Sequence, residues 1–420
     1  MALDTGPRNV AVVGAGMVGL STAWFLQEHG ADVTVFDRDG VAAGASWGNA
    51  GWLTPGLATP LPEPAVLSYG VRAVLSPSSP VYVPPSASPR LLRFLAGFAA
   101  NSTAAKWRRA MESLVPINGR ALESFDMLTD GGVKAETSDA GSFIAAYRTA
   151  EERRVLIEEI EHIRAAGQKL EYEAVDGDRA RELEPALSDE IGAAVVLFGQ
   201  RFIEPGRFVH ALADSVRGRG GEIREGAEVI GVDDTGGAHG GVEVRTSGGG
   251  AGRFDAVVLA NGVWLGDLAR RFGVREIVQA GRGYSFSVPM ERVPEGPVYF
   301  PSQRVACTPM DGRLRVAGMM EFRRPDAPLD PRRIRAIVEA ARPLLRGADL
   351  AARHDEWVGS RPCTRDGLPL IGATRSPRVF AAGGHGMWGI TLGPATGRLL
   401  AEQIVTGGRP AELRPFDPLR

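Results

Sequence analysis

The chain has 420 residues, which predicts two or three domains at about 150 residues each. Hydrophobic residues make up 44% and charged residues 23%, as in ordinary globular proteins, so a disordered chain is excluded. The 48 basic and 50 acidic side chains nearly cancel, so no basic field exists to hold a nucleic acid. Cys307 and Cys363 cannot build a disulfide framework or a zinc cluster, and the scattered histidines indicate no metal site.

The N-terminal region carries no charge over residues 9–27, which is long enough to resemble a membrane span. Glycines interrupt it, however, and its first part is a β-type run. We predict a buried strand at Asn9–Val13, a helix at Met17–His29 and a second strand at Asp32–Phe36. The chain therefore begins with a β-turn-α-β unit and is expected not to cross a membrane.

The next stretch, Trp52–Pro89, is rich in proline and predicts an extended, loop-rich excursion, because proline ends helices and disrupts central strands. Helices and strands then alternate. We predict helices at Arg90–Leu114, Glu151–Ala166, Pro205–Arg219, Pro331–Leu345 and about 391–405. We predict strands at Ser142–Tyr147, Glu222–Val232, Val242–Thr246, Phe254–Leu259 and Val379–Ala382, and strand-like runs with a hairpin turn at Asp311-Gly312 within Glu276–Glu321.

Nucleotide-fold elements thus occur at the start, near residues 200–262, and at the end of the chain. This pattern favours an α/β protein in which one domain is assembled from distant segments and a second domain is inserted between them.

The strongest motif is Gly14-Ala15-Gly16-Met17-Val18-Gly19, which follows a strand and opens a helix. Gly14 allows a tight turn, Gly16 lets the backbone approach a pyrophosphate, and Gly19 permits close packing, while the helix N-terminus attracts phosphate. Asp37 ends the second strand, where its carboxylate can accept a hydrogen bond from a ribose hydroxyl. The arrangement predicts a dinucleotide site.

The identity of the dinucleotide is less constrained. Asp37 argues against a 2′-phosphate and hence against NADP, but it does not separate NAD from FAD. Two later strand-then-glycine layouts favour the longer FAD, which needs contacts beyond the first β-α-β unit. They are Ala260-Asn261-Gly262 after one strand, and Gly383-Gly384-His385-Gly386 before the last helix. An NAD-dependent dehydrogenase stays open as an alternative.

Other candidate residues lie in small-residue or arginine-containing segments. The segment Gly44–Gly51 suits close approach to a phosphate or a ring. Arg361 can grip a carboxylate with its planar guanidinium. Tyr284 lies among glycines that would admit a ligand, and His385 lies between glycines, an unusual place for a packing histidine.

The whole chain resembles the FAD-dependent amine oxidoreductases of the D-amino-acid oxidase superfamily. Within it, the sequence is most similar to bacterial D-amino-acid dehydrogenases of the small-subunit type, with glycine oxidase and sarcosine oxidase more distant. The resemblance is carried by five segments: residues 12–19, 46–51, 282–285, 359–372 and 383–389. The last two are the most specific.

This resemblance implies a Rossmann-like FAD-binding domain with an inserted antiparallel-sheet substrate domain. The expected FAD-binding domain comprises residues 1–58, 150–268 and 352–420, and the substrate-binding domain comprises residues 59–149 and 269–351. The implied cofactor contacts are Gly14, Ala15, Gly16, Met17, Gly19, Asp37, Arg38, Ser46, Asn49, Ala50, Gly51, Val229, Ala260, Asn261, Gly262, Gly384, Gly386, Met387, Gly389 and Thr391. The implied catalytic residues are Arg361, Tyr284, Arg282 and His385.

The resemblance also implies the chemistry: oxidative deamination of a D-amino acid to a 2-oxo acid and ammonia, by hydride transfer to flavin N5. The alternatives are a glycine-, sarcosine- or proline-type amine oxidase, or a flavin-carrying subunit of a larger dehydrogenase complex. The electron acceptor is a quinone or O₂, and the location is cytoplasmic or peripheral at the inner face of the membrane. Cys363 directly precedes Thr364, unlike the flavin-linked cysteine of sarcosine oxidases, so we expect non-covalent FAD.

The chain departs from its relatives in two places. Dehydrogenase relatives often have Lys-Gly-Tyr where this chain has Arg282-Gly283-Tyr284. Trp47 and Trp388 are bulky residues beside the expected site, and they leave the size of the substrate open.

Overall fold

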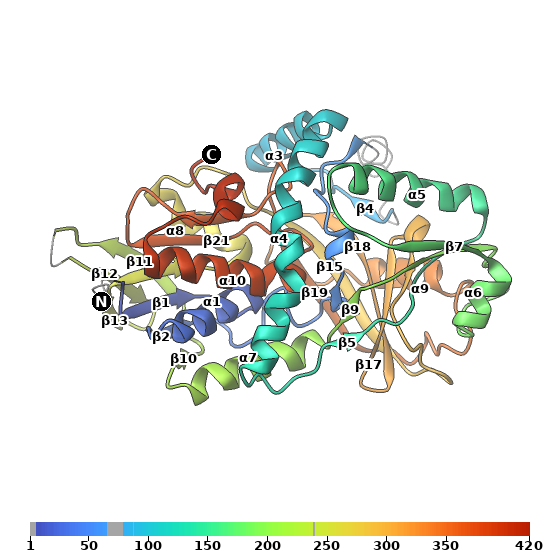
Figure 1. The fold of residues 1–420 in the computed structure, drawn as a ribbon, viewed down its shortest axis with the longest axis horizontal. Coiled ribbons are helices and arrows are strands. Elements are labelled where there is room, and N and C mark those ends of the chain that lie inside the picture. The colour runs from blue at the N-terminus through green and yellow to red at the C-terminus, as the bar shows by residue number, and fades with distance from the viewer. Residues whose placement is uncertain (1–5, 65–78, 87, 238–239) are drawn as a thin grey trace.

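The computed structural model describes residues 6–64, 79–86, 88–237 and 240–420. It contains two main sheets, one on either side of the long helix α4 (Ala104–Asp130) in the view of Figure 1. This mixed α/β arrangement confirms the expected fold class. Part of the predicted proline-rich excursion, residues 65–78 and 87, lies outside the described residues. No helix in the described parts of the chain is both long and apolar enough to cross a membrane.

The first sheet has six strands, and its first five are parallel. Its spatial order is β10 (Glu222–Arg224), β2 (Asp32–Phe36), β1 (Asn9–Val13), β14 (Ala256–Leu259), β21 (Val379–Gly383) and the antiparallel β20 (Leu370–Ala373). Strands that are distant in sequence are therefore neighbours, as expected for a domain assembled from separate segments. The strands consist mainly of buried apolar residues, because both faces of the sheet are covered.

The alternation of side chains along β1 shows how the two faces are covered. Val10 and Val12 pack in a core with α1 (Met17–Glu28), α4, α7 (Pro205–Gly218) and α10 (Gly389–Thr406). Ala11 and Val13 point to the opposite face, where they pack against α8 (Leu265–Ala269) and a small sheet. That sheet consists of β11 (Val229–Asp234), β12 (Val242–Thr246) and β13 (Ala251–Phe254).

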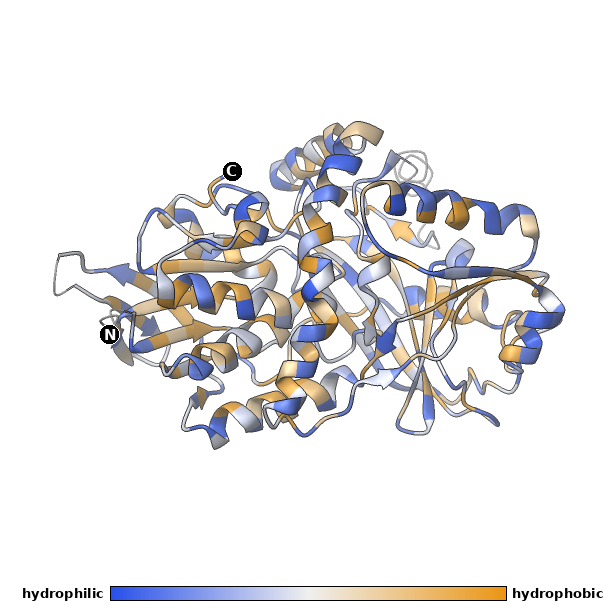
Figure 2. Cartoon of the chain, viewed as in Figure 1, coloured by the Kyte–Doolittle hydropathy of each residue, from blue (hydrophilic) through white to orange (hydrophobic). Residues whose placement is uncertain are grey.

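The second sheet has nine strands and is mainly antiparallel. Its main order is β19 (His354–Cys363), β15 (Gln279–Val288), β18 (Arg313–Phe322), β17 (Val305–Met310), β16 (Val298–Phe300), β6 (Phe143–Tyr147), β8 (Ala193–Leu197) and β7 (Tyr172–Asp176), and β4 (Val81–Tyr82) pairs with β18. One face packs against α9 (Pro331–Ala341) and α6 (Gly177–Leu183), and the other packs against α5 (Ala150–Ala165). Figure 2 shows hydrophobic residues along the strands and hydrophilic stretches along α5.

Smaller elements complete the chain. They are the three-stranded sheet of β3 (Trp52–Leu53), β9 (Arg201–Phe202) and β5 (Ser138–Asp139), the helix α3 (Pro89–Asn101), and the 3-10 turns η1 (Pro55–Leu57), η2 (Gly262–Trp264), η3 (Arg270–Phe272), η4 (Pro301–Gln303) and η5 (Ala411–Phe416).

Several sequence-based boundaries were wrong. The single helix predicted at Arg90–Leu114 is two helices, α3 and α4, because the Ser88 and Thr103 hydroxyls cap separate N-termini. The single strand predicted at Glu222–Val232 is two strands, which pair in different sheets. Strands β7 and β8 were not predicted. Strand β8 is a short, wholly buried apolar run, which periodicity cannot distinguish from part of a buried helix, and apolar and polar residues do not alternate regularly along β7.

Strand pairing also groups the chain differently from the expected domain boundaries. Strands β7, β8 and β19 belong to the nine-stranded sheet, although residues 150–268 and 352–420 were expected to follow the first sheet. Helix α4 packs in the core of the first sheet instead of the second. We therefore propose that residues 104–130 go with the cofactor domain and that residues 143–197 and 354–363 go with the substrate domain.

Candidate functional site

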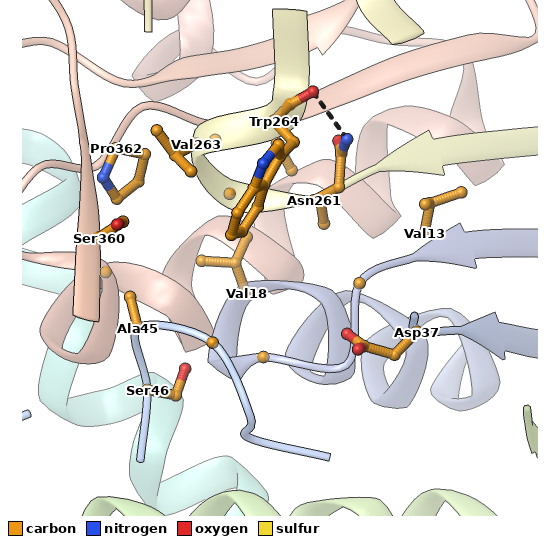
Figure 3. A pocket seen from close by; sticks show the side chains of 18 of the residues that line it. Val13, Val18, Asp37, Ala45, Ser46, Asn261, Val263, Trp264, Ser360 and Pro362 are labelled. Atoms are coloured by element: carbon orange, nitrogen blue, oxygen red, sulfur yellow. Dashed lines mark hydrogen bonds between the residues drawn. The ribbon is translucent and has the colours of Figure 1, made fainter. Parts of the chain in front are cut away.

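A cavity of about 380 Å³ opens at the carboxyl ends of β1, β2, β14 and β21. In parallel α/β sheets this edge is where ligands bind. Figure 3 shows Val13 and Asp37 at the strand ends, with Ala45 and Ser46 on the loop below and Trp264 projecting between them. The predicted cofactor residues that line this cavity are Gly14, Gly16, Met17, Asp37, Arg38, Ser46, Asn49, Val229, Ala260, Asn261, Gly262, Gly386, Met387 and Gly389.

The glycine motif forms a cradle that side chains would fill. Gly14 has a φ of +115°, and a Cβ on it would lie 2.4 Å from the Ala260 carbonyl oxygen. A Cβ on Gly19 would lie 1.9 Å from the Gly14 carbonyl oxygen, so the helix contacts the turn directly. Helix α1 begins at Met17 after the N-cap Gly16, which supplies no side-chain cap; the Met17 N–H donates to the Ser46 Oγ at 3.2 Å, and no acidic residue lies in the first turn. Its N-terminus can therefore receive a phosphate group.

Asp37 is held by backbone donors at the rim of this cavity. Its Oδ2 accepts a hydrogen bond from the Ala15 N–H at 2.8 Å, and its Oδ1 accepts from the Asp39 and Gly40 N–H groups at 2.9 and 3.0 Å. These bonds fix the carboxylate at the end of β2, where an adenosine ribose would lie in a Rossmann-type site. The residues of the cavity thus fit the dinucleotide that the motif predicts.

Replacing Asp37 by alanine is expected to weaken FAD binding at least about tenfold, because a charged hydrogen bond contributes about 1.5 kcal/mol or more. The dissociation constant is measured by titrating FAD into the flavin-free protein and following flavin fluorescence. Asp32→Ala, at the exposed start of the same strand, is the matched control and should bind FAD normally. An unchanged dissociation constant in Asp37→Ala would refute the ribose role.

Six predicted cofactor residues do not line this cavity. Ala15 is fully buried, and Gly19 packs on the Gly14 turn. A Cβ on Gly51 would lie 2.1 Å from the Ile203 carbonyl oxygen, and a Cβ on Gly384 would lie 2.8 Å from the Thr364 side chain, so both glycines are packed against other parts of the chain. Ala50 and Thr391 line a second, adjoining cavity instead. Trp264, near the centre of Figure 3, was missed, although it lies only two residues after the predicted Ala260-Asn261-Gly262 segment.

The second cavity has a volume of about 220 Å³ and shares Asn49, Arg361 and Met387 with the first. Its walls come from the nine-stranded sheet, from the start of α10 and from the loop that follows β3. Aromatic side chains make much of the lining: Trp52, Phe98, Tyr299, Phe322 and Trp388. A small organic molecule placed here would lie next to a cofactor in the first cavity.

Arg361 lies at the junction of the two cavities. Its Nη1 donates to the Met319 carbonyl at 2.8 Å. In the described part of the chain, no carboxylate lies within 4.0 Å of its guanidinium, and burial lowers its pKa from the ordinary value. A Cβ on Gly283 would lie 2.1 Å from the Arg361 Nη2, so this glycine leaves room for the guanidinium. Among the described residues, Arg361 thus has no carboxylate as a countercharge, a condition that favours binding of an anionic group.

The carbonyl that orients Arg361 belongs to a strained residue. Met319 has a φ of +67°, a left-handed conformation that non-glycine residues adopt uncommonly. Such strain persists where the surrounding structure fixes it, and it concentrates at functional sites. Here it directs a carbonyl toward the Arg361 guanidinium at the edge of the cavity.

Arg282 and Tyr284 are not brought to either cavity. Their side chains are almost wholly buried in the nine-stranded sheet, where the Tyr284 hydroxyl donates to Glu321 Oε2 at 2.7 Å and Arg282 pairs with the same oxygen at 3.4 Å. Tyr284 packs in the core with α9. Alternation along β15 explains this outcome, because Gly283 faces Arg361 and its two neighbours point to the opposite face. Their catalytic roles stay predictions without support from their positions.

His385 does line the first cavity. Its Nε2 lies 2.9 Å from the Thr396 hydroxyl oxygen, and burial lowers the pKa of the ring to about 4. The imidazole is therefore neutral at pH 7, and it suits hydrogen bonding better than charge stabilisation.

A pH-dependent stability follows from His385. Its pKa is about 6.5 in the unfolded chain and about 4 in the folded chain, so the unfolded state takes up the proton first as the pH falls. Acidification from pH 7.5 to 5.0 should therefore lower the free energy of unfolding by about 2 kcal/mol more in the wild type than in His385→Gln. Urea unfolding at both pH values measures this difference, and parallel losses would contradict it.

Trp47 and Trp388 differ in position. Trp388 lines the second cavity and donates its indole N–H to the Thr59 carbonyl at 2.8 Å. Trp47 lines neither of the two cavities and packs below the Arg315 guanidinium. Of these two tryptophans, only Trp388 therefore limits the space of the second cavity.

Together, the fold and the two adjoining cavities define a dinucleotide-dependent oxidoreductase with a separate substrate chamber. The chain belongs to the DAO family of FAD dependent oxidoreductases, whose sequence profile matches residues 9–403. Its cofactor is FAD, which confirms the expectation and removes the NAD alternative.

Solved structures share the whole fold. Glycine oxidase from Geobacillus kaustophilus matches with a TM-score of 0.73 at 24% identity, covering 99% of this chain and 98% of that one. Iminodiacetate oxidase from Chelativorans sp. BNC1 matches with a TM-score of 0.69 at 19% identity, covering 97% of this chain and 98% of that one. L-proline dehydrogenase from P. horikoshii matches with a TM-score of 0.70 at 18% identity, covering 99% of this chain and 98% of that one. These likenesses support the fold and do not single out D-amino-acid dehydrogenases.

Proposed function

We propose that this oxidoreductase oxidises the C–N bond of an amino acid, with the D-amino acids as its substrates. The observation that carries the proposal is Arg361, an arginine without an acidic partner in the described residues, at the junction of the cofactor cavity and the substrate chamber. A carboxylate on this guanidinium places the substrate's Cα next to the cofactor cavity. Orientation of this kind lowers the barrier without any covalent step on the protein.

When bound, FAD would supply the acceptor for a hydride from Cα; a neutral amine that loses this hydride becomes an iminium ion and, after losing a proton, an imine. Water then hydrolyses the imine to a 2-oxo acid and ammonia. The protein's own groups bind and orient: Arg361 holds the carboxylate, and the aromatic walls exclude water from the reacting carbon. No strong protein base is required if the substrate binds as a neutral amine, because its lone pair then assists the departure of the hydride.

The preference for D-amino acids is supported by the sequence resemblance of residues 359–372 and 383–389 to bacterial D-amino-acid dehydrogenases. The test is anaerobic addition of D-amino acids, L-amino acids, glycine, sarcosine and proline to the purified flavoprotein. Bleaching of the flavin bands by the D-amino acids alone is expected. Bleaching by the L-amino acids alone would refute the stereochemical part of the proposal.

A second candidate is a glycine-type or secondary-amine oxidase. It is supported by the fold likeness to glycine oxidase, iminodiacetate oxidase and L-proline dehydrogenase, and by Trp388, which restricts the chamber. Bleaching by glycine, sarcosine or proline in preference to larger amino acids would select this candidate. Flavin bands that no amine bleaches until a partner protein is added would instead indicate a flavin-carrying subunit.

A further inference from the structure

A second group of polar side chains lines the same chamber as Arg361. It comprises Glu63 after η1, Glu159 on α5, Tyr299 on β16 and Arg304 after η4, and we name these four residues the acidic cluster. The Arg304 guanidinium lowers the pKa of both Glu63 and Glu159, and the Glu63 carboxylate raises that of Glu159. Arg361 is not among the groups that shift either pKa. Among the described residues, no ion pair within 4.0 Å joins Arg361 to Glu63 or Glu159, so the chamber is lined by two unconnected charged groups.

The charges within the acidic cluster do not balance. The Arg304 Nη2 lies 3.7 Å from the Glu63 Oε1, and the nearby Tyr299 hydroxyl also raises the pKa of Arg304. Among the described residues, no ion pair within 4.0 Å reaches the Glu159 carboxylate. Arg304 is therefore paired with Glu63, and Glu159 faces the chamber without an ion-pair partner among the described residues.

The electrostatics of the two glutamates agree with this imbalance. Withdrawal from bulk water and, less strongly, the neighbouring Glu63 carboxylate together raise the pKa of Glu159 to about 7, against the opposing effect of Arg304. Burial also raises the pKa of Glu63, despite the Arg304 guanidinium beside it. A carboxylate in this condition is stabilised in its charged form by a second cation.

We propose that the acidic cluster binds a cationic group of the substrate, so that the substrate is a basic amino acid with its carboxylate on Arg361 and its ammonium or guanidinium group at Glu159 and Glu63. The carboxylate end of this assignment rests on the proposed function. Trp52, Phe98 and Phe322 also line the chamber and suit an aliphatic chain.

Other substrates fit the chamber less well. A second carboxylate on the substrate would meet two glutamates, and the only guanidinium in the acidic cluster is already paired with one of them. A neutral side chain would leave Glu159, whose pKa is raised to about 7, without a group that favours its charged form. A cationic group satisfies Glu159 and leaves the Glu63–Arg304 pair in place.

The first experiment measures binding without oxidation. The FAD-loaded protein is titrated with 5-guanidinopentanoate, with its neutral analogue 5-ureidopentanoate and with heptanedioate, and the flavin absorbance is followed. These acids carry no α-amine, so binding is read whether or not amines are oxidised. We expect the guanidino acid to bind at least tenfold more tightly than the ureido acid. Equal binding, or tighter binding of heptanedioate, overturns the proposal.

Variants locate the effect. Glu159→Gln should remove the tenfold preference and leave binding of 5-ureidopentanoate unchanged, and Glu63→Gln should reduce the preference. The matched control is Glu158→Gln, one residue earlier on α5 with an exposed side chain. If a variant fails to retain FAD, the preference of the wild type for 5-guanidinopentanoate over 5-ureidopentanoate still tests the proposal. Equal losses for both probes in Glu159→Gln would overturn the assignment of that residue.

The second experiment separates this inference from the proposed function. Anaerobic flavin reduction is compared for D-arginine and D-citrulline, which have the same shape but differ in charge. We expect a kcat/KM at least tenfold higher for D-arginine in the wild type. Flavin reduction by both at equal rates supports the proposed function and overturns the cationic subsite. Selective binding of 5-guanidinopentanoate without flavin reduction by any amine supports the subsite and overturns the proposed function.

Discussion

Arg361→Ala is expected to raise KM about 100-fold for the substrate that bleaches the flavin, while the visible flavin spectrum stays unchanged. A charged hydrogen bond contributes about 1.5–3 kcal/mol, and a guanidinium that holds a carboxylate with two bonds lies at the upper end of that range. Arg361 is also the residue that places Cα against the cofactor cavity, so kcat should fall as well.

Two further variants sharpen this prediction. Arg361→Lys keeps the positive charge but loses the planar guanidinium that binds a carboxylate through two hydrogen bonds. Compared with Arg361→Ala, it should recover part of the substrate affinity but little of the substrate orientation. Arg313→Ala, at an exposed position on the same nine-stranded sheet, is the matched control and should behave as the wild type. Steady-state kinetics and thermal unfolding are measured for each. Normal kinetics in Arg361→Ala would overturn the carboxylate-binding role and the proposed function with it.

Gly19→Ala is expected to abolish FAD retention and to lower the free energy of unfolding by about 3 kcal/mol or more. The added Cβ would lie 1.9 Å from the Gly14 carbonyl oxygen, a backbone atom that can move only if the turn between β1 and α1 opens. That turn forms the cradle for the cofactor phosphates, so one substitution disturbs both the fold and the binding site.

The control for this prediction is Gly119→Ala on α4. A Cβ there would meet nothing within 4 Å, and alanine in a helix is favoured over glycine by up to about 1 kcal/mol. Gly119→Ala should therefore retain FAD and be at least as stable as the wild type. The ratio of flavin to protein absorbance and chemical unfolding measure both effects. FAD retention by Gly19→Ala would contradict the packing argument.

The contrast between Asp37 and Tyr284 shows what sequence-based prediction could reach. Asp37 lies in a local motif in which a strand, a turn, a helix and a second strand follow each other directly, so its place at the cavity followed from short-range geometry. Tyr284 lies in a glycine-rich strand that suggested an open site. Its side chain points into the core because the neighbouring Gly283 faces Arg361, and only strand pairing reveals this.

Arg361 was predicted from a resemblance spanning residues 359–372, and the structure adds why it suits its position. Gly283 on the neighbouring strand leaves space for its guanidinium, and the Met319 carbonyl from a third strand orients it. These contacts join residues far apart in the sequence. No local pattern indicates them, because each depends on the register of β15 against β18 and β19.

By itself, the sequence determined the class of fold and the phosphate-binding turn, because those features depend on short segments with regular spacing, while FAD rather than NAD followed from the likeness of the whole chain to the family. Only the tertiary structure decided the extent of the two sheets, the burial of Arg282 and Tyr284, and the acidic cluster. The members of that cluster come from four separate segments, and their side chains share one chamber only after the second sheet and α5 have packed together. Long-range packing, which no single segment encodes, therefore set the substrate side of the site.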